Sequence, residues 1–195
     1  MELESICVFC GANPGVRPEY RAAAEAFGRR VADEGLTLVY GGGNVGLMGA
    51  VADAALAAGG RVKGVIPGFL KDKEVAHGGL SELIVTESMH QRKAQMAAHS
   101  DAFVALPGGF GTFEELFEMV TWSQLHLHKK PVALLNLNGF YDPLMALIDK
   151  GITEGFIRED NRGLVTAHPD IDDLFAALRT YHHRAADRWL PTVAG

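Results

Sequence analysis

The chain has 195 residues, of which 48% are hydrophobic and 22% are charged, a balance typical of a folded globular protein and not of a disordered one. Its 24 acidic and 18 basic residues give a formal net charge of -6, which argues against a protein that coats nucleic acid. No apolar run is long enough to span a bilayer, and the acidic start differs from a signal peptide. We therefore expect a single cytoplasmic domain, 1–195, with no membrane partner.

Apolar runs of strand length alternate with segments of helical period along the chain. The predicted strands cover residues 6–10, 36–40, 61–66, 82–85, 102–106, 131–137 and 164–166. The predicted helices cover about 20–34, 46–58, 89–99, 112–127, 142–154 and 171–182. This alternation predicts an α/β three-layer sandwich, with a mostly parallel sheet flanked by helices on both faces.

Three of the predicted strands end in glycine-bearing turns, at Gly11, at residues 41–46 and at residues 108–111. The carboxyl ends of parallel strands open on one edge of a sheet, where ligands bind. Glycine lets backbone N–H groups approach a ligand closely, and the helix that follows presents its positive dipole end to an anion. Three such turns on one edge favour a phosphate site over simple strand endings.

The turn at residues 41–46 matches the pattern G-x-G-x-x-G, which often indicates a dinucleotide site. However, it lies in the second strand–helix unit, and the end of the next strand offers no carboxylate for a ribose hydroxyl. No G-x-x-x-x-G-K-[ST] sequence is present, so a P-loop is excluded. A mononucleotide is the simpler ligand.

Two acidic residues, Glu114 and Glu115, follow the third glycine turn in the first turn of a predicted helix. Carboxylates in this position interact favourably with the helix dipole, which is a sufficient structural reason for one of them. They lie about 100° apart around the helix, so we expect them to have different roles. Periodicity alone leaves open which of the two faces the ligand.

Three potential cations, His90, Arg92 and Lys93, stand at the start of another predicted helix, where positive charge is unfavourable. A phosphate or a carboxylate would supply the missing partner, although a solvated basic face is the alternative. The two cysteines, Cys7 and Cys10, point to opposite faces of a strand, which argues against a disulfide between them. No cluster at ligand spacing favours a metal site.

These motifs resemble those of the Lonely Guy family, the cytokinin riboside 5′-monophosphate phosphoribohydrolases long misnamed lysine decarboxylases. The family signature P-G-G-x-G-T-x-x-E is complete at residues 107–115, and M-H-x-R-K is complete at residues 89–93. The turns at 7–11 and 40–49 are also similar. The sequence departs slightly at Ala12–Asn13, where the family often has a small hydroxyl residue, and at Asn44, where it often has Ser.

The resemblance implies a Rossmann-like fold, a homodimer without a cofactor, and hydrolysis of the N-glycosidic bond of an N6-modified adenosine 5′-monophosphate to free base and ribose 5-phosphate. It also implies that Arg92 and Glu115 are the catalytic pair and thereby selects Glu115 over Glu114. The substrate-binding set that it implies comprises Glu74, Arg92, Lys93, Gly108, Gly109, Phe110, Gly111, Thr112, Phe113, Glu114, Glu115 and Thr121.

Cleavage of an N-glycosidic bond passes through an oxocarbenium-like sugar, which a carboxylate near C1′ stabilises. Because a helix N-terminus favours an ionised carboxylate, we expect Glu115 to stabilise charge rather than act as a strong base. Arg92 neutralises the phosphate or holds Glu115 in place. The alternatives are a general AMP nucleosidase and a non-catalytic nucleotide or cofactor carrier. The presence of both Arg92 and Glu115 argues against the carrier, and no lysine lies in a setting that demands pyridoxal phosphate.

Overall fold

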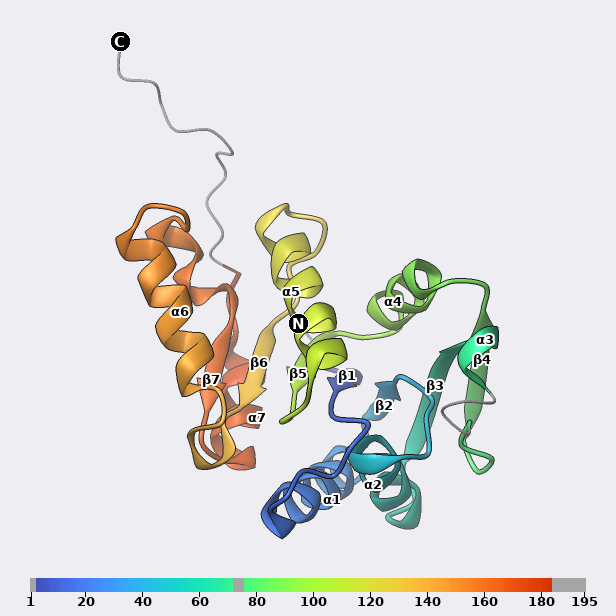
Figure 1. The fold of residues 1–195 in the computed structure, drawn as a ribbon. Coiled ribbons are helices and arrows are strands. Elements are labelled where there is room, and N and C mark those ends of the chain that lie inside the picture. The colour runs from blue at the N-terminus through green and yellow to red at the C-terminus, as the bar shows by residue number, and fades with distance from the viewer. Residues whose placement is uncertain (1–2, 72–75, 184–195) are drawn as a thin grey trace.

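A computed structural model describes residues 3–71 and 76–183, and their strands form a seven-stranded parallel sheet in the order β4-β3-β2-β1-β5-β6-β7 (Figure 1). The strands are β1 (Ser5–Phe9), β2 (Thr37–Tyr40), β3 (Arg61–Pro67), β4 (Glu82–Thr86), β5 (Ala102–Ala105), β6 (Val132–Leu135) and β7 (Thr166–His168). The order reverses at β1, whose neighbours are β2 and β5. In an open α/β sheet, such a switch point places a crevice beyond the carboxyl ends of the strands.

Helices cover both faces of this sheet, which gives the three predicted layers (Figure 1). The helices are α1 (Pro18–Asp33), α2 (Gly46–Ala57), α3 (Gly68–Lys71), α4 (Met89–Ala98), α5 (Phe110–Gln124), α6 (Asp142–Thr153) and α7 (Ile171–Thr180). One apolar core lies between the sheet and α1, α2 and α7, and the other between the sheet and α4, α5 and α6. The predicted α/β Rossmann-like class is confirmed.

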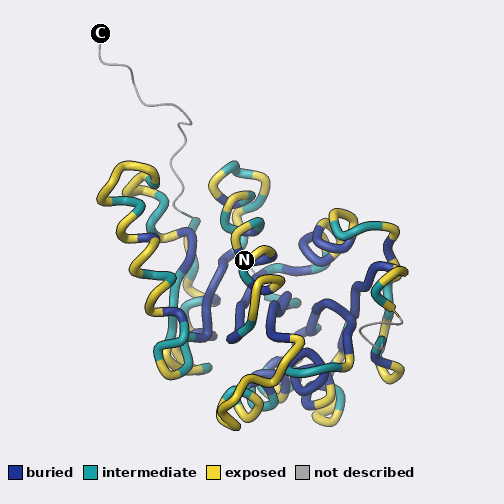
Figure 2. Tube along the Cα trace, in the orientation of Figure 1, coloured by how far each residue is buried: buried dark blue, intermediate teal, exposed yellow. Residues whose placement is uncertain are grey.

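The central strand shows why the sheet is buried on both faces. Ile6, Val8 and Cys10 belong to the first core, while Cys7 and Phe9 belong to the second. Figure 2 shows the central strands in dark blue, as buried residues, while the edge strands β4 and β7 are more exposed. The two cysteines are free thiols on opposite faces, as their spacing predicted. Apolar side chains on both faces explain the continuous hydrophobic run of the sequence.

Some predicted boundaries were wrong. The last strand is Thr166–His168 and not 164–166, because residues up to Leu164 form a 3-10 turn (Glu159–Leu164). The helix after the third glycine turn begins earlier than predicted, at Phe110, because Gly109 is its N-cap residue. The short helix α3 was not predicted, since four residues are too few to show a period.

None of the helices in the described part of the chain has both the length and the apolar character that crossing a membrane requires.

Candidate active site

A cleft of about 440 Å³ opens at the carboxyl edge of the sheet, at the switch point between β1 and β5. This volume lies in the range of small-molecule sites. The cleft is lined by the turn after β1, by the loop after β5, and by side chains of α1, α2, α4, α5 and the turn before α6. The lining residues are 10–15 and 107–112 with Tyr20, Leu47, Met48, Arg92, Glu115 and Phe140. Two of the three predicted glycine turns therefore line one cavity.

The loop after β5 is held from both sides. The N–H of Gly11 donates to the carbonyl of Pro107 at 3.2 Å, and the hydroxyl of Tyr141 donates to the carbonyl of Leu106 at 2.7 Å. A Cβ atom at Gly108 would lie 2.1 Å from Oγ1 of the buried Thr112, so only glycine lets the loop close on α5. The first N–H groups of α5, which have no partner within a helix, are thereby fixed beside the cleft, where an anion can bind.

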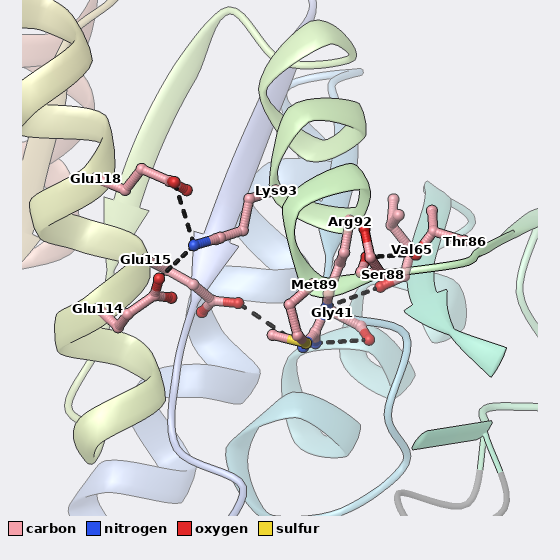
Figure 3. Close-up of polar contacts among 10 residues, drawn as sticks. All are labelled: Gly41, Val65, Thr86, Ser88, Met89, Arg92, Lys93, Glu114, Glu115 and Glu118. Atoms are coloured by element: carbon pink, nitrogen blue, oxygen red, sulfur yellow. Dashed lines mark hydrogen bonds and ion pairs between the residues drawn. The ribbon is translucent and has the colours of Figure 1, made fainter. Parts of the chain in front are cut away.

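Arg92 reaches the cleft from α4 and is 5% exposed. Its Nε donates to the carbonyl of Val65 at 3.1 Å, and Nη2 donates to the carbonyl of Gly41 at 2.9 Å (Figure 3). The remaining nitrogen, Nη1, lies 4.0 Å from Oε1 of Glu115. Two carbonyls thus orient the guanidinium while one of its edges faces the carboxylate and the cleft.

The two neighbouring glutamates of α5 have different surroundings. Glu115 is 9% exposed and lines the cleft, whereas the side chain of Glu114 is 53% exposed and does not. Glu115 points toward Arg92 in Figure 3, and Glu114 points toward Lys93. The choice that periodicity left open is therefore answered by position: only Glu115 faces the cavity.

Lys93, although adjacent to Arg92, is not among the residues that line the cleft. It is 5% exposed and forms ion pairs with Glu114 and, at 3.1 Å, with Glu118 (Figure 3). Burial by itself lowers the pKa of Lys93, but the hydrogen bonds that its ammonium donates to Glu114 and Glu118 outweigh burial, and the pKa is raised. The carboxylate partner predicted for this cation is thus supplied by α5.

The other residues of the predicted substrate-binding set are scattered. Gly108 to Thr112 line the cleft, but Phe113 packs edge-on against Tyr141 at 6.5 Å between ring centroids. Thr121 is exposed on α5 and does not line the cleft. Glu74 lies outside the described residues.

The second glycine turn, residues 41–46, does not line the cavity itself. Its role is indirect, because the Gly41 carbonyl orients Arg92 and the helix after the turn presents Leu47 and Met48 to the cleft. Sequence reasoning also missed Tyr20 and Phe140, whose rings pack edge to face with centroids 6.0 Å apart at the wall of the cleft. Neither aromatic lies in a motif, so only the fold could bring them together.

Two buried thiols near the site, those of Cys7 and Cys10, are expected to be unreactive. Burial, followed by the nearby Glu115 carboxylate, raises the pKa of Cys7 and of Cys10 well above the usual value. Both side chains are therefore neutral thiols at physiological pH and poor nucleophiles or metal ligands. Within residues 3–71 and 76–183, no group of three His, Cys, Asp or Glu side chains is arranged to hold a metal ion.

Comparison with known proteins places this geometry in a family. A family model described as possible lysine decarboxylase matches residues 48–178. A cytokinin riboside 5′-monophosphate phosphoribohydrolase of Rhodococcoides fascians is 53% identical over 178 residues, which cover 91% of this chain and 90% of that protein. One of Oryza sativa subsp. japonica is 48% identical over 176 residues, covering 90% and 73%.

Among solved structures, the molybdenum cofactor carrier protein of Chlamydomonas reinhardtii has a similar fold, with a TM-score of 0.69 and 25% identity over 91% of this chain and 97% of that one. The sequence identity to the phosphoribohydrolases is about twice as high and extends over nearly the whole chain. The resemblance that the two motifs predicted is confirmed: the chain belongs to the Lonely Guy family of cytokinin riboside 5′-monophosphate phosphoribohydrolases, to which the description of possible lysine decarboxylase is attached.

Proposed function

We propose that this chain hydrolyses the N-glycosidic bond of N6-modified adenosine 5′-monophosphates, releasing the free cytokinin base and ribose 5-phosphate. Relatives named for this reaction are 48% and 53% identical to it over most of its length. The observation that carries the proposal is the position of Glu115, a buried carboxylate that lines the cleft one helical turn after a loop suited to phosphate. A phosphate seated on that loop brings the attached sugar toward Glu115.

The reaction adds the hydroxyl of a water molecule to C1′ of the ribose, breaks the C1′–N9 bond, and delivers the proton of that water to the departing base. Positive charge develops on the sugar as the bond breaks, and a fixed carboxylate stabilises it without reorganising. Arg92 faces Glu115 across 4.0 Å, and its guanidinium is held by two backbone carbonyls. In this proposal, Glu115 and Arg92 are the catalytic residues.

The cleft does not suit the decarboxylase chemistry that the family description mentions. That reaction needs a lysine that binds pyridoxal phosphate. No lysine is among the described residues that line the cleft, and the nearby Lys93 is occupied by Glu114 and Glu118. The residues present therefore favour hydrolysis.

The proposal is tested by incubating the purified chain with AMP, with N6-isopentenyl-AMP and with the two corresponding ribosides, and by measuring free base and ribose 5-phosphate. We expect release from the modified monophosphate and none from the ribosides, because the loop binds the phosphate. Equal release from AMP would indicate a general nucleosidase. No release from any of the four compounds would contradict the proposal and favour a carrier.

Two variants test the catalytic pair, Glu115→Gln and Arg92→Ala. Each is expected to lower turnover by about 10²- to 10³-fold, the size of effect seen when an electrostatic stabiliser is removed, while leaving a folded protein. Glu154→Gln is the control, since the side chain of Glu154 forms an exposed ion pair with Lys150 at the C-terminal end of α6. Near-normal turnover in either variant would remove that residue from the catalytic pair.

We further propose that the chain acts as one cytoplasmic domain and pairs with a second copy. Two free cysteines in the core suit a reducing compartment. Phe110 and Phe117 of α5 are 91% and 40% exposed, and such apolar exposure near a site favours a protein partner. The proposed binding residue Thr121 is exposed on the same helix outside the cleft, and we propose that a second chain completes its role. Sedimentation of the purified chain at several concentrations tests the pairing.

A further inference from the structure

The ion pairs of Lys93 connect two helices that otherwise face each other across the site. Lys93 belongs to α4, and Glu114 and Glu118 belong to α5 (Figure 3). The Lys93 side chain is 6% exposed, and Nζ lies 3.1 Å from Oε1 of Glu118. This is not a loose surface contact: a buried ammonium is costly unless its hydrogen bonds are made, and it keeps a fixed position once they are.

The Lys93 ammonium also relieves a repulsion between the carboxylates of Glu114 and Glu118. Glu114 and Glu118 are four residues apart on one helix, where like charges destabilise each other unless a cation lies between them. The side chain of Glu118 is 21% exposed, and its Oε2 is buried without a hydrogen-bond partner in the described part of the chain. The cost of burying that oxygen is offset by the ammonium that Oε1 accepts from.

The same two helices carry the proposed catalytic pair. Arg92 directly precedes Lys93 on α4, and Glu115 lies between Glu114 and Glu118 on α5. The gap of 4.0 Å between Nη1 of Arg92 and Oε1 of Glu115 is wider than a hydrogen bond. Lys93, one residue further along α4, lies within hydrogen-bond distance of Glu114 and Glu118 on α5.

We infer that Glu118 is a positioning residue which, by holding Lys93, sets α5 against α4 so that Glu115 faces Arg92 across the cleft. This assigns Lys93 a role in aligning the helices rather than in contacting the substrate phosphate, and it rests on the proposed function. A displacement of about 1 Å at a reacting group can cost about 100-fold in rate. Loss of this link should therefore lower kcat while substrate affinity, which depends on the glycine loop, changes little.

The test is a double-mutant cycle with Glu118→Ala and Lys93→Met, assayed on N6-isopentenyl-AMP. We expect Glu118→Ala to lower kcat about 10-fold with KM within about twofold of the unaltered chain. Glu118→Gln keeps an oxygen that accepts from Lys93 and should stay within about threefold. Lys93→Met should lower kcat at least as much as Glu118→Ala. Adding Glu118→Ala to Lys93→Met should cost nothing further, because it removes a repulsion from Glu114.

Glu154→Ala is the matched control, since it breaks an exposed Lys–Glu pair at the C-terminal end of α6 and is expected to leave kcat unchanged. If Glu118→Ala does not fold, the comparison is made between Lys93→Met and Lys93→Met/Glu118→Gln. A normal kcat in a folded Glu118→Ala chain would overturn the inference, as would a Lys93→Met chain in which only KM rises. Absence of turnover in the unaltered chain would instead reject the proposed function and this inference with it.

Discussion

The position of Arg92 depends on a residue that has no side chain. Gly41 accepts a hydrogen bond from Nη2 of Arg92 at 2.9 Å, and a Cβ atom built on Gly41 would lie only 2.0 Å from that nitrogen. The guanidinium therefore occupies the space that any other residue at position 41 would fill. This close approach explains a glycine that does not line the cleft.

Gly41→Ala should displace the Arg92 guanidinium and thereby lower kcat/KM by about 100-fold, the usual cost of misplacing a catalytic group by about 1 Å. The added methyl group should also cost about 1–3 kcal/mol of stability through overpacking. Steady-state assays and urea unfolding measure the two effects. Gly163→Ala is the control, because no atom lies within 4 Å of a Cβ built there. Normal kcat/KM in Gly41→Ala would show that Arg92 is not needed at this position.

The individual site residues were only partly predictable from the sequence. Spacing around α5 predicted that Glu114 and Glu115 differ, but the direction of each depended on where α4 lies, which local sequence does not contain. The misplaced cations of α4 correctly predicted a need for anionic partners. For Lys93 the partners are glutamates on α5, a contact that the fold creates across a separation of more than twenty residues.

The helix α4 carries Arg92 and Lys93, and its start is fixed by a side-chain cap. Ser88 is the N-cap residue, and its hydroxyl accepts a hydrogen bond from the N–H of Gln91 at 3.2 Å. In a second, reciprocal hydrogen bond, the side-chain oxygen of Gln91 accepts from the backbone N–H of Glu87 at 2.9 Å. Arg92 follows in the same first turn, so its backbone position depends on these contacts.

Ser88→Ala should lower the free energy of unfolding by about 1 kcal/mol, the typical value of an N-cap. It should also lower kcat/KM several-fold, because the turn that carries Arg92 becomes less ordered. Asp170→Ala provides the comparison: Asp170 caps α7 by accepting from the N–H of Asp173 at 2.9 Å, on the opposite face of the sheet from α4. Equal stability losses with an activity loss in Ser88→Ala alone are expected. Equal activity losses would mean that the effect of Ser88→Ala is not local.

Elements were predictable where the sequence pattern and the local hydrogen bonding agree. The central strands and the long helices are where the periodicity places them. The prediction of a strand at residues 164–166 was wrong because Leu164 and Val165 are buried without being in the sheet. An apolar run indicates burial, but it does not by itself indicate a strand. The predicted strand at 131–137 is shorter, since Asn138 and Gly139 adopt positive φ in a tight turn that ends the sheet ladder.

At the scale of the whole molecule, the two cores enclose two thiols and one phenol that stay protonated, those of Cys7, Cys10 and Tyr141. Burial, followed by the Glu115 carboxylate, raises the pKa of Cys7 and Cys10 above the ordinary 9.0. Burial, followed by Cys10, likewise raises the pKa of Tyr141. All three belong to residues packed in the centre of the sheet or against it. The folded state therefore requires these three side chains to be neutral.

This condition predicts alkaline destabilisation with a defined source. Above the ordinary thiol pKa of 9.0, Cys7 and Cys10 ionise in the unfolded chain but not in the folded one. The folded state then holds more protons, so stability is intact below this pKa and falls as the pH rises above it. Each thiol should cost about 1 kcal/mol between about pH 9 and pH 10. Urea unfolding at a series of pH values measures the free energy of unfolding of the chain and of a Cys7→Ala/Cys10→Ala variant. The free energy of unfolding should fall much less with pH in the variant. Tyr141 contributes to the loss at still higher pH. The same loss in both chains would show that the thiols are not the cause.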